Sequence, residues 1–445
     1  MHVSANLTSV TGLAVHKGQV WAGTPGGLVS WNATGQARHW TRKDGLPGIR
    51  IRTLAVINGD LWGLAEKPFR LTTAGFKVEP SFPAVGVGAM LSVNGLPGRA
   101  VGSTLVKGAR VWAIPESGLW TIAGTKAIEF KPQPPTRRVT SLASDQEERT
   151  YVGTTDKGVL KFDGSKWSAL PLPGQRLAGF DASALAACNE GLWIVPREGS
   201  AFTTEGKMSA AKGAPWRQSV KWRGLTVIRR ADGRLASIDA AGTESPLGVV
   251  LPRVNATSIF ILGETLFVSQ PGGWSEFTPG SDPVHRFDVE PLKGCPTTSI
   301  WADQKQIAIG TQNNGLILIS RDSGAFTHLH EAHGMTDDWV TAIAPDGQGG
   351  LLIGTFVGGL LRWDGEKITK IGLAGGCVNR LLVDGKSIWV GSLSGVYLYH
   401  EGKPTKPSWN RLIEPDVYDL AKIKGQLWVA AGGALHKISN PDFAD

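Results

Sequence analysis

The sequence predicts an all-β protein, a β-propeller of about eleven four-stranded blades. Three observations lead to this fold class: a recurring sequence frame, a period of about 41 residues between its copies, and an abundance of glycine. The frame consists of a short apolar run, Gly-Thr, a few variable residues, a second Gly and another apolar run. Its copies read VWAGTPGGLVSW (20–31), YVGTTDKGVLKF (151–162), IAIGTQNNGLILI (307–319), LLIGTFVGGLLRW (351–363) and IWVGSLSGVYLY (388–399).

Each copy of the frame describes two strands joined by a tight turn, which we call the frame turn. Residues such as those of 20–22 favour a pleated, half-buried surface. The glycine of Gly-Thr, the frame glycine, has no side chain, which fits a point where another backbone passes closely or the strand bends. The second glycine supplies the positive φ of a tight turn. A preceding run such as VTAIAPD (340–346) and a strand after Asp364-Gly365 complete four strands per unit.

The spacing of the frame sets the number of units and leaves their arrangement open. Clear or degraded copies run from Gly23 to Ala430, one of them in ambiguous register near 225–239, and give about eleven units. Eleven blades exceed the usual ring of about four to eight. The chain therefore forms either one large ring or two smaller rings.

The domain organisation follows from the same count. We expect one continuous repeat array over residues 1–445, with a division into two propellers near 213–252, where the spacing is irregular, as the alternative. The last unit, 416–445, offers only three strands. Residues His2–Leu7 are expected to add the missing outer strand, which would remove an exposed sheet edge.

Composition restricts the partners and the compartment. The net charge of +8 and the pI of about 9.3 suit an anionic partner as well as a solvated surface. No run of 18 or more apolar residues occurs, so no membrane span is expected. The N-terminus lacks the pattern of a signal peptide, so the protein is expected to be cytoplasmic if Met1 is native, and periplasmic or extracellular if a leader was removed.

Several patterns that often carry chemistry have a structural explanation here. HLHEAHG (328–334) looks like a metal cluster, but it aligns with HWTRKDG (39–45) and is therefore an inter-blade connection. The three cysteines form no C-x-x-C pair, and no G-x-S-x-G, P-loop or G-x-G-x-x-G motif is present. We accordingly expect no metal, no cofactor and no catalytic residue.

Basic and aromatic residues give weaker indications. The densest basic stretch is WRQSVKWRGLTVIRRADGR (216–234), whose mixture of bases and aromatics suits single-stranded nucleic acid, although strand alternation distributes it over both sheet faces. Nucleic acid is therefore not the expected partner. Tryptophans outside the main register of the frame are candidates for a contact surface; they are Trp40, Trp216, Trp222, Trp274, Trp301, Trp339 and Trp409.

The inter-blade segments carry a family likeness. HWTRKDGLPGIRIRTLAVINGDLW (39–62) and HLHEAHGMTDDWVTAIAPDGQGGLLIGTFVGGLLRWDG (328–365) resemble the two-component regulator propeller repeat. The likeness covers about residues 7–75 and 295–440. It implies an extracytoplasmic propeller of the kind found in bacterial hybrid histidine kinases, which detect carbohydrate fragments, and in free-standing periplasmic or surface proteins. No kinase part is present, so the resemblance implies a stand-alone module.

The predicted function is non-enzymatic binding through one face of the propeller. The expected partner is either a protein or an anionic glycan. Strand alternation places the frame turns and inter-blade segments at the same end of the blades, and binding residues generally lie on such loops. The candidate binding residues are Arg50, Asp337, Asp338 and Trp339 from inter-blade segments, and Asp156, Gln312, Asn313 and Phe356 from frame turns.

Two alternatives remain open at this point. A polysaccharide-acting enzyme, a lyase or hydrolase, would carry a cluster of ionisable groups with perturbed pKa values at the channel mouth. An assembly scaffold that encircles or docks a protein segment would expose an apolar or aromatic patch.

Overall fold

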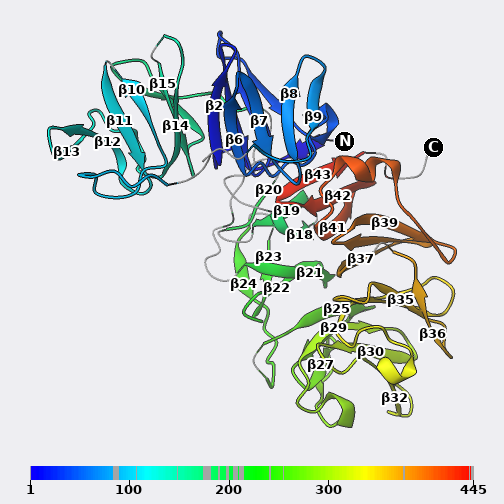
Figure 1. Cartoon of the computed structure of the whole chain (residues 1–445). Coiled ribbons are helices and arrows are strands. Elements are labelled where there is room, and N and C mark those ends of the chain that lie inside the picture. Colours follow the sequence, from blue (N-terminus) through cyan, green and yellow to red (C-terminus); the bar gives the residue numbers. More distant parts are fainter. Residues whose placement is uncertain are drawn as a thin grey trace. The chain divides into compact units, whose positions relative to one another are not determined.

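The computed structural model confirms an all-β fold of eleven sheets. The structure describes residues 2–441, apart from 84–89, 107, 148, 174–181, 189–190, 197–199, 204–208, 210–214, 240–241, 254, 374–375 and 440. Over these residues ten sheets have four strands and one has three, each strand antiparallel to its neighbours, and no α-helix occurs (Figure 1). The predictions of a β-propeller and of about eleven blades are confirmed.

The chain divides into two compact units. One comprises Val3–Asp181, and the other comprises Ala182–Asp445 together with Met1–His2. The boundary thus lies ahead of the region 213–252, where the sequence suggested a division. We call the two units the four-bladed unit and the seven-bladed unit, after the sheets that each contains.

The four-bladed unit follows the chain in order, with one sheet for every four consecutive strands. Its strands are β2 (Gly12–His16), β3 (Gln19–Thr24), β4 (Gly27–Trp31), β5 (Ala37–Trp40); β6 (Thr53–Ile57), β7 (Asp60–Leu64), β8 (Pro68–Thr72), β9 (Gly75–Val78); β10 (Gly102–Val106), β11 (Ala109–Ile114), β12 (Gly118–Ala123), β13 (Lys126–Glu129); β14 (Val139–Ser144), β15 (Thr150–Thr154), β16 (Val159–Phe162) and β17 (Trp167–Ala169). A 3₁₀ helix, η1 (Arg42–Asp44), lies between β5 and β6.

The seven-bladed unit continues the same pattern. Its strands are β18 (Ala182–Cys188), β19 (Gly191–Pro196), β20 (Phe202–Thr203); β21 (Trp216–Trp222), β22 (Leu225–Arg230), β23 (Leu235–Ile238), β24 (Glu244–Pro246); β25 (Ser258–Leu262), β26 (Thr265–Gln270), β27 (Gly273–Phe277), β28 (Val284–Arg286); β29 (Thr297–Ala302), β30 (Gln306–Thr311), β31 (Leu316–Ser320), β32 (Phe326–Leu329); β33 (Val340–Pro345), β34 (Leu351–Thr355), β35 (Leu360–Trp363), β36 (Ile368–Ile371); β37 (Val378–Asp384), β38 (Ser387–Ser392), β39 (Gly395–His400), β40 (Lys403–Thr405); β41 (Val417–Ile423), β42 (Gln426–Ala431) and β43 (Ala434–Ile438). The remaining 3₁₀ helices are η2 (Glu290–Leu292), η3 (Glu331–His333) and η4 (Ser408–Leu412).

The innermost strands of the seven-bladed unit form a closed ring. Each packs on the next in the order β18, β21, β25, β29, β33, β37 and β41, and β41 packs back on β18. In the last blade the strand order is β1-β43-β42-β41, so β1 (His2–Ser4), which begins in this unit, takes the outer position. In the four-bladed unit β2 packs on β6, β10 on β14, and β14 returns to β2.

The frame glycine is required because a side chain of the next blade packs on it. A Cβ at Gly354 would lie 2.7 Å from Val378 Cγ1, and one at Gly310 would lie 2.6 Å from Val340 Cγ1. Both distances are shorter than any relaxed carbon contact. The sequence predicted a close approach at this position; the group that approaches is a β-branched side chain at the start of the next inner strand.

The frame threonine closes the turn that follows. In β34 the hydroxyl of Thr355 donates to the carbonyl of Gly359 at 2.9 Å, and in β30 Thr311 donates to Gly315 at 3.0 Å. The same Thr311 oxygen accepts from the N–H of Asn314 at 2.8 Å. Because both hydroxyl functions are used inside the turn, the intervening residues are held outward in a fixed conformation.

A second recurring bond joins neighbouring blades. A polar side chain near the start of an inner strand donates to a backbone carbonyl at the start of the next inner strand, which satisfies a buried acceptor. The set comprises Thr298 to Val340, Thr341 to Val378 at 2.5 Å, Asn379 to Val417 at 2.7 Å and, in the four-bladed unit, Thr11 to Ile51 at 2.5 Å.

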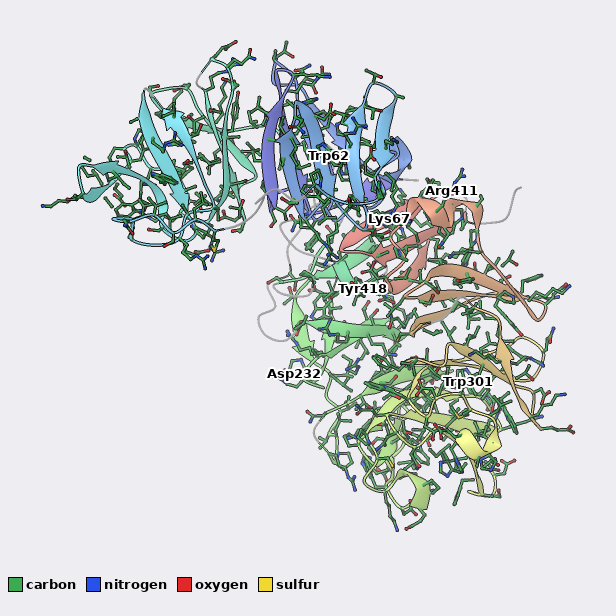
Figure 2. The ribbon with its side chains drawn as sticks, in the orientation of Figure 1. Trp62, Lys67, Asp232, Trp301, Arg411 and Tyr418 are labelled. Carbon is green, nitrogen blue, oxygen red and sulfur yellow. The ribbon has the colours of Figure 1, made fainter. Side chains whose placement is uncertain are left out.

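Apolar side chains fill the space between the sheets. Trp301, for example, is 8 % exposed and lies among the side chains of the seven-bladed unit, as Figure 2 shows. Trp216, Trp222 and Trp274 are also buried. The expectation that Trp216, Trp222 and Trp274 form a contact surface is therefore wrong, because they pack between sheets.

Candidate binding sites of the seven-bladed unit

Most of the predicted binding residues lie on the frame-turn side of the seven-bladed unit. Six of the eight belong to this unit, and we call them the frame-turn surface: Gln312, Asn313, Asp337, Asp338, Trp339 and Phe356. Arg50 and Asp156 belong to the four-bladed unit. Both are exposed, and the Asp156 carboxylate accepts from Thr136 at 3.5 Å.

Two aromatic residues of the frame-turn surface stack on each other. The rings of Trp339 and Phe356 have centroids 4.2 Å apart and an interplanar angle of 19°. The N–H of Phe356 also donates to the carbonyl of Trp339 at 3.0 Å. Stacking and the backbone bond together tie the inter-blade segment to the frame turn of its own blade, so the two rings form a prearranged apolar platform.

Asp337 braces the same turn. One carboxylate oxygen accepts from the N–H of Val357 at 2.7 Å and from that of Gly358 at 3.3 Å, and the other accepts from the N–H of Trp339 at 3.0 Å. A carboxylate that accepts several backbone bonds fixes the conformation of the loop that supplies them. The role that the structure gives to Asp337 is thus to hold Trp339 and Phe356 in place.

Asp338 faces the neighbouring blade. Its backbone carbonyl accepts from the N–H of Gly315, at 2.9 Å, and so fixes the segment to the frame turn that carries Gln312 and Asn313. Its Oδ1 is buried without a hydrogen-bond partner. Burial, and then the charge of Glu331, raise the pKa of Asp338 above its ordinary value.

Exposed apolar side chains continue from the aromatic pair. Phe356 is 43 % exposed and its neighbour Val357 is 67 % exposed. Leu393, which occupies in the next blade the position of Phe356, is 46 % exposed. Gln312 and Asn313 are exposed on the preceding turn. The frame-turn surface therefore presents aromatic and aliphatic groups beside amides that can both donate and accept hydrogen bonds.

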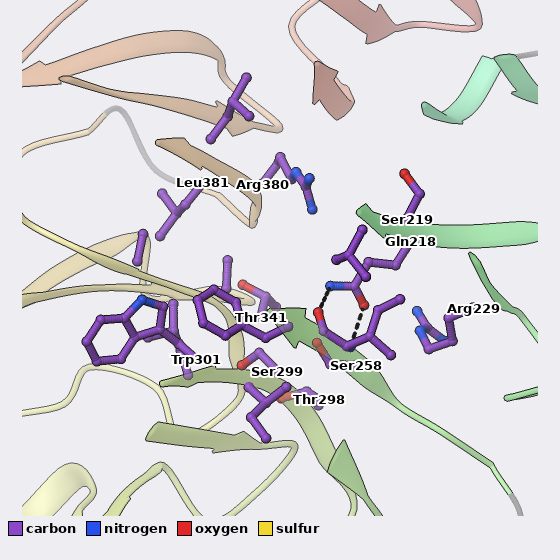
Figure 3. A pocket seen from close by; sticks show the side chains of 18 of the residues that line it. Gln218, Ser219, Arg229, Ser258, Thr298, Ser299, Trp301, Thr341, Arg380 and Leu381 are labelled. Atoms are coloured by element: carbon purple, nitrogen blue, oxygen red, sulfur yellow. Dashed lines mark hydrogen bonds between the residues drawn. The ribbon is translucent and has the colours of Figure 1, made fainter. Parts of the chain in front are cut away.

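A second candidate site is the channel inside the ring. A cavity of about 630 Å³ is lined by the inner strands β21, β25, β29, β33 and β37 and by Arg229 of β22. Its described lining includes the cations Arg217, Lys221, Arg229 and Arg380 and contains no Asp, Glu or His. Figure 3 shows Arg229 and Arg380 at different walls of this cavity, with Gln218 bonded to the backbone of Ile259 between them.

The sequence did not single out these channel residues as a site. Arg217, Lys221 and Arg229 all belong to the basic stretch 216–234, so the signal was present in the composition of that segment. The sequence alone does not identify which of these basic residues line the channel, because strand alternation does not give the register of the strands.

The histidine-rich segment 328–334 joins two neighbouring blades. His328 bonds the carbonyl of Asn314 through Nε2 at 2.8 Å, and the ring centroids of His330 and His333 lie 4.4 Å apart. Within the described part of the chain no group of three or more His, Cys, Asp or Glu side chains is arranged to hold a metal ion. The same part of the chain contains no helix with the length and hydropathy of a membrane span.

Comparison with known proteins identifies relatives by fold. No protein-family model matches the chain, and no curated protein matches its sequence. Among solved structures, the chain is similar to PorZ, described as a bacterial surface component of the type-IX secretion system of Porphyromonas gingivalis, with a TM-score of 0.65 and 12% identity over 98% of this chain and 86% of that one. It is also similar to the extracellular domain of the putative hybrid two component system BT3049 of B. thetaiotaomicron, with a TM-score of 0.50 and 15% identity over 97% of this chain and 68% of that one. At these identities the likeness is one of fold.

Proposed function

We propose that this protein is a non-enzymatic binding module of the bacterial cell envelope, which holds a ligand or partner protein on the frame-turn surface of its seven-bladed unit. The observation that carries the proposal is the Trp339–Phe356 stack, with ring centroids 4.2 Å apart. Rigid, partly exposed aromatic groups contribute much of the binding energy at recognition surfaces, because little conformational entropy is lost on contact.

The sequence resemblance of 39–62 and 328–365 to the two-component regulator propeller repeat supports the location that we propose, the periplasm or the cell exterior. Structural neighbours include the extracellular domain of a putative hybrid two component system. A stand-alone sensor or surface component of this kind would bind either a protein or an anionic glycan. The net charge of +8 favours an acidic partner in both cases.

The lining of the channel favours binding over polysaccharide hydrolysis. Glycosidases ordinarily place two carboxyl groups about 5–10 Å apart on either side of the bond that is cleaved. The described residues that line the cavity of about 630 Å³ include four cations and no carboxylate. A hydrolase would therefore need its acid pair elsewhere.

The test is retention of envelope components by the full chain. Immobilised protein is exposed to lysate and envelope fractions, and the retained protein and glycan are both identified. The variant W339A/F356A removes the aromatic pair. F326A is the matched control, because Phe326 is 48 % exposed on the outer strand β32 of the same unit.

We expect one component to be retained by the wild type and by F326A but at least tenfold less by W339A/F356A. A protein would identify a scaffold or assembly role, and a glycan released by moderate salt would identify a sensor. Equal retention by all three chains, or no retention by the wild type, would contradict the proposal.

A further inference from the structure

One blade of the seven-bladed unit carries a charged residue at the position of the frame glycine. In β30, β34 and β38 the frame glycine pairs with the third residue of the inner-strand segment, as Gly354 does with Ala342. In β22 the residue in this register is Arg229, which pairs with Gln218 across the same bulge. A long cationic side chain thus stands where β30, β34 and β38 have only a hydrogen atom.

The next blade also differs from the regular pattern. In regular blades the residue that packs on the frame glycine is a valine two positions before the paired residue of the next inner strand, such as Val378 on Gly354. The residue in that place after Arg229 is Ala256, which is 2 % exposed. A smaller side chain thus stands where the regular blades have a valine, and Ala256 and Arg229 line one hollow.

The guanidinium group of Arg229 lacks an anionic partner. Arg229 Nε is buried with no hydrogen-bond partner, and Nη1 makes only a long bond of 3.4 Å to the carbonyl of Arg230. Burial, and then the charge of Arg217, lower the pKa of Arg229 to about 10, so it remains charged at neutral pH. No carboxylate in the described part of the chain lies within ion-pair distance of it.

Neighbouring arginines are neutralised by the chain itself. Arg230, the next residue, is held by Glu244 at 2.6 and 3.1 Å. Arg380, across the cavity, lies 3.3 Å from a carboxylate oxygen of Asp419. Because an unpaired buried charge costs several kcal/mol, a chain that supplies counter-ions to these two cations and none to Arg229 leaves a position for an external anion.

Two hollows meet at Arg229. It lines both the channel cavity of about 630 Å³ and an adjoining hollow of about 600 Å³ between Asp232 and Thr298. Thr257 also lines both, and its hydroxyl lies 2.6 Å from that of Thr297 and 2.9 Å from that of Ser269. The arginine is therefore reached from open space, and Thr257 can donate to the same anion when it accepts from these two hydroxyls.

We infer that Arg229, with Arg217 and the hydroxyl of Thr257, forms an oxyanion-binding site in the channel of the seven-bladed unit. The ligand class is a small molecule that carries a carboxylate or a phosphate group, since a guanidinium fork matches either group in two parallel hydrogen bonds. The cavity volume of about 630 Å³ falls within the range of small-molecule pockets. This site is separate from the Trp339–Phe356 surface and does not depend on it.

The test measures binding of defined probes to the full chain. Glucuronate represents the carboxylate class, inorganic phosphate represents the phosphate class, and glucose is the uncharged probe, all at constant ionic strength. Titration calorimetry and the midpoint of thermal unfolding report binding. The variants are R229M, which keeps the stem, and R229G, which restores the residue of the regular blades.

R234M is the matched control, because Arg234 lies in the same blade with its side chain 76% exposed. We expect the wild type and R234M to bind at least one anionic probe and not glucose, and R229M and R229G to bind it at least about tenfold more weakly. Preference for glucuronate or for phosphate identifies the ligand class. R229M without probe should unfold no earlier than the wild type, because it loses an uncompensated charge.

Two results would overturn the inference. One is that neither anion binds the wild type better than glucose does. The other is that R229M and R234M bind the anions equally, which would place the anion elsewhere. Loss of envelope retention by W339A/F356A with anion binding intact would show that the two sites are independent.

Discussion

The blade β33–β36 and the blade β21–β24 share one architecture and differ at the position of the frame glycine. The first has Gly354 against Val378, a contact that leaves no room for a Cβ. The second has Arg229 in the register of the glycine and Ala256 in the place of the valine. The comparison teaches that the glycine of the repeat is a packing requirement set by the next blade, and that the blade without it is followed by a smaller residue than valine.

The two blades also differ at their frame-turn ends. Trp339 and Phe356 stack in the regular blade, whereas the equivalent positions in the other blade hold Pro215 and Ala231, joined by the same backbone bond at 2.8 Å. One blade thus carries its large side chains on the outer turn and the other carries a charge toward the channel. The repeat fixes the backbone and leaves these positions free to differ.

The largest effect is expected when the arginine is moved into the regular blade. Gly354→Arg would place a Cβ 2.7 Å from Val378 Cγ1 and bury an unpaired charge. The expected loss of stability is at least about 3 kcal/mol, measured by urea unfolding. Adding Val378→Ala should restore part of it. A Gly354→Arg chain as stable as the wild type would show that the frame glycine is not constrained by the next blade.

A smaller effect is expected when the valine is moved into the unusual blade. Ala256→Val should destabilise the wild type by about 1–3 kcal/mol, because it meets the stem of Arg229. In the Arg229→Gly background the same substitution recreates the regular pair and should cost little. The free energies of unfolding of the wild type, the two single variants and the double variant give the coupling energy between the two positions, which we expect to be about 1–2 kcal/mol. Additive effects would show that the two positions do not pack together.

The bond between neighbouring blades should contribute about 1 kcal/mol. Thr341→Val removes the hydroxyl that donates to the carbonyl of Val378 at 2.5 Å and leaves that acceptor with one partner fewer. Thr369→Val on the outer strand β36 is the control, since Thr369 is exposed in the same blade. The urea midpoints of the two variants are compared, and equal midpoints would indicate that the bond adds nothing to stability.

The smallest effect concerns the carboxyl group of Asp338. Its pKa is raised in the folded protein by burial and by Glu331, while His328 and His330 act in the opposite direction. Folded protein therefore holds the proton more tightly than the unfolded chain, whose Asp pKa is about 3.9. Stability is gained below that value and is lost as the pH rises through the raised folded pKa.

Asp338→Asn lacks this dependence. Its stability relative to the wild type should increase between about pH 4 and pH 7, by less than about 1 kcal/mol because the group is partly exposed. Thermal unfolding of both chains across this range measures the difference, in which the histidine contributions largely cancel. A difference that is constant with pH, or that decreases as the pH rises, would contradict the raised pKa.

Much of the fold could be predicted from local pattern. The frame and its period gave the strands, the turns and the eleven sheets, because each blade is specified by about 41 residues that repeat the same alternation and the same glycines. The placement of Trp339 and Phe356 on one loop surface also followed from strand alternation. Their stacking did not, since it depends on how an inter-blade segment lies on the frame turn of the same blade.

The sequence by itself determined the blade, and the tertiary structure decided how the blades close and which side chains face the channel. Ring closure depends on contacts such as that between β41 and β18. These two strands are more than 200 residues apart in the sequence, and because the blades repeat one pattern, the sequence does not indicate which two blades meet. The significance of Arg229 likewise required the register, because only the pairing with Gln218 shows that it stands in a glycine's place. The local sequence determines the structure of each blade. The repeat makes many blade–blade contacts equivalent, so long-range packing decides how the blades close into rings and which cations line the channel.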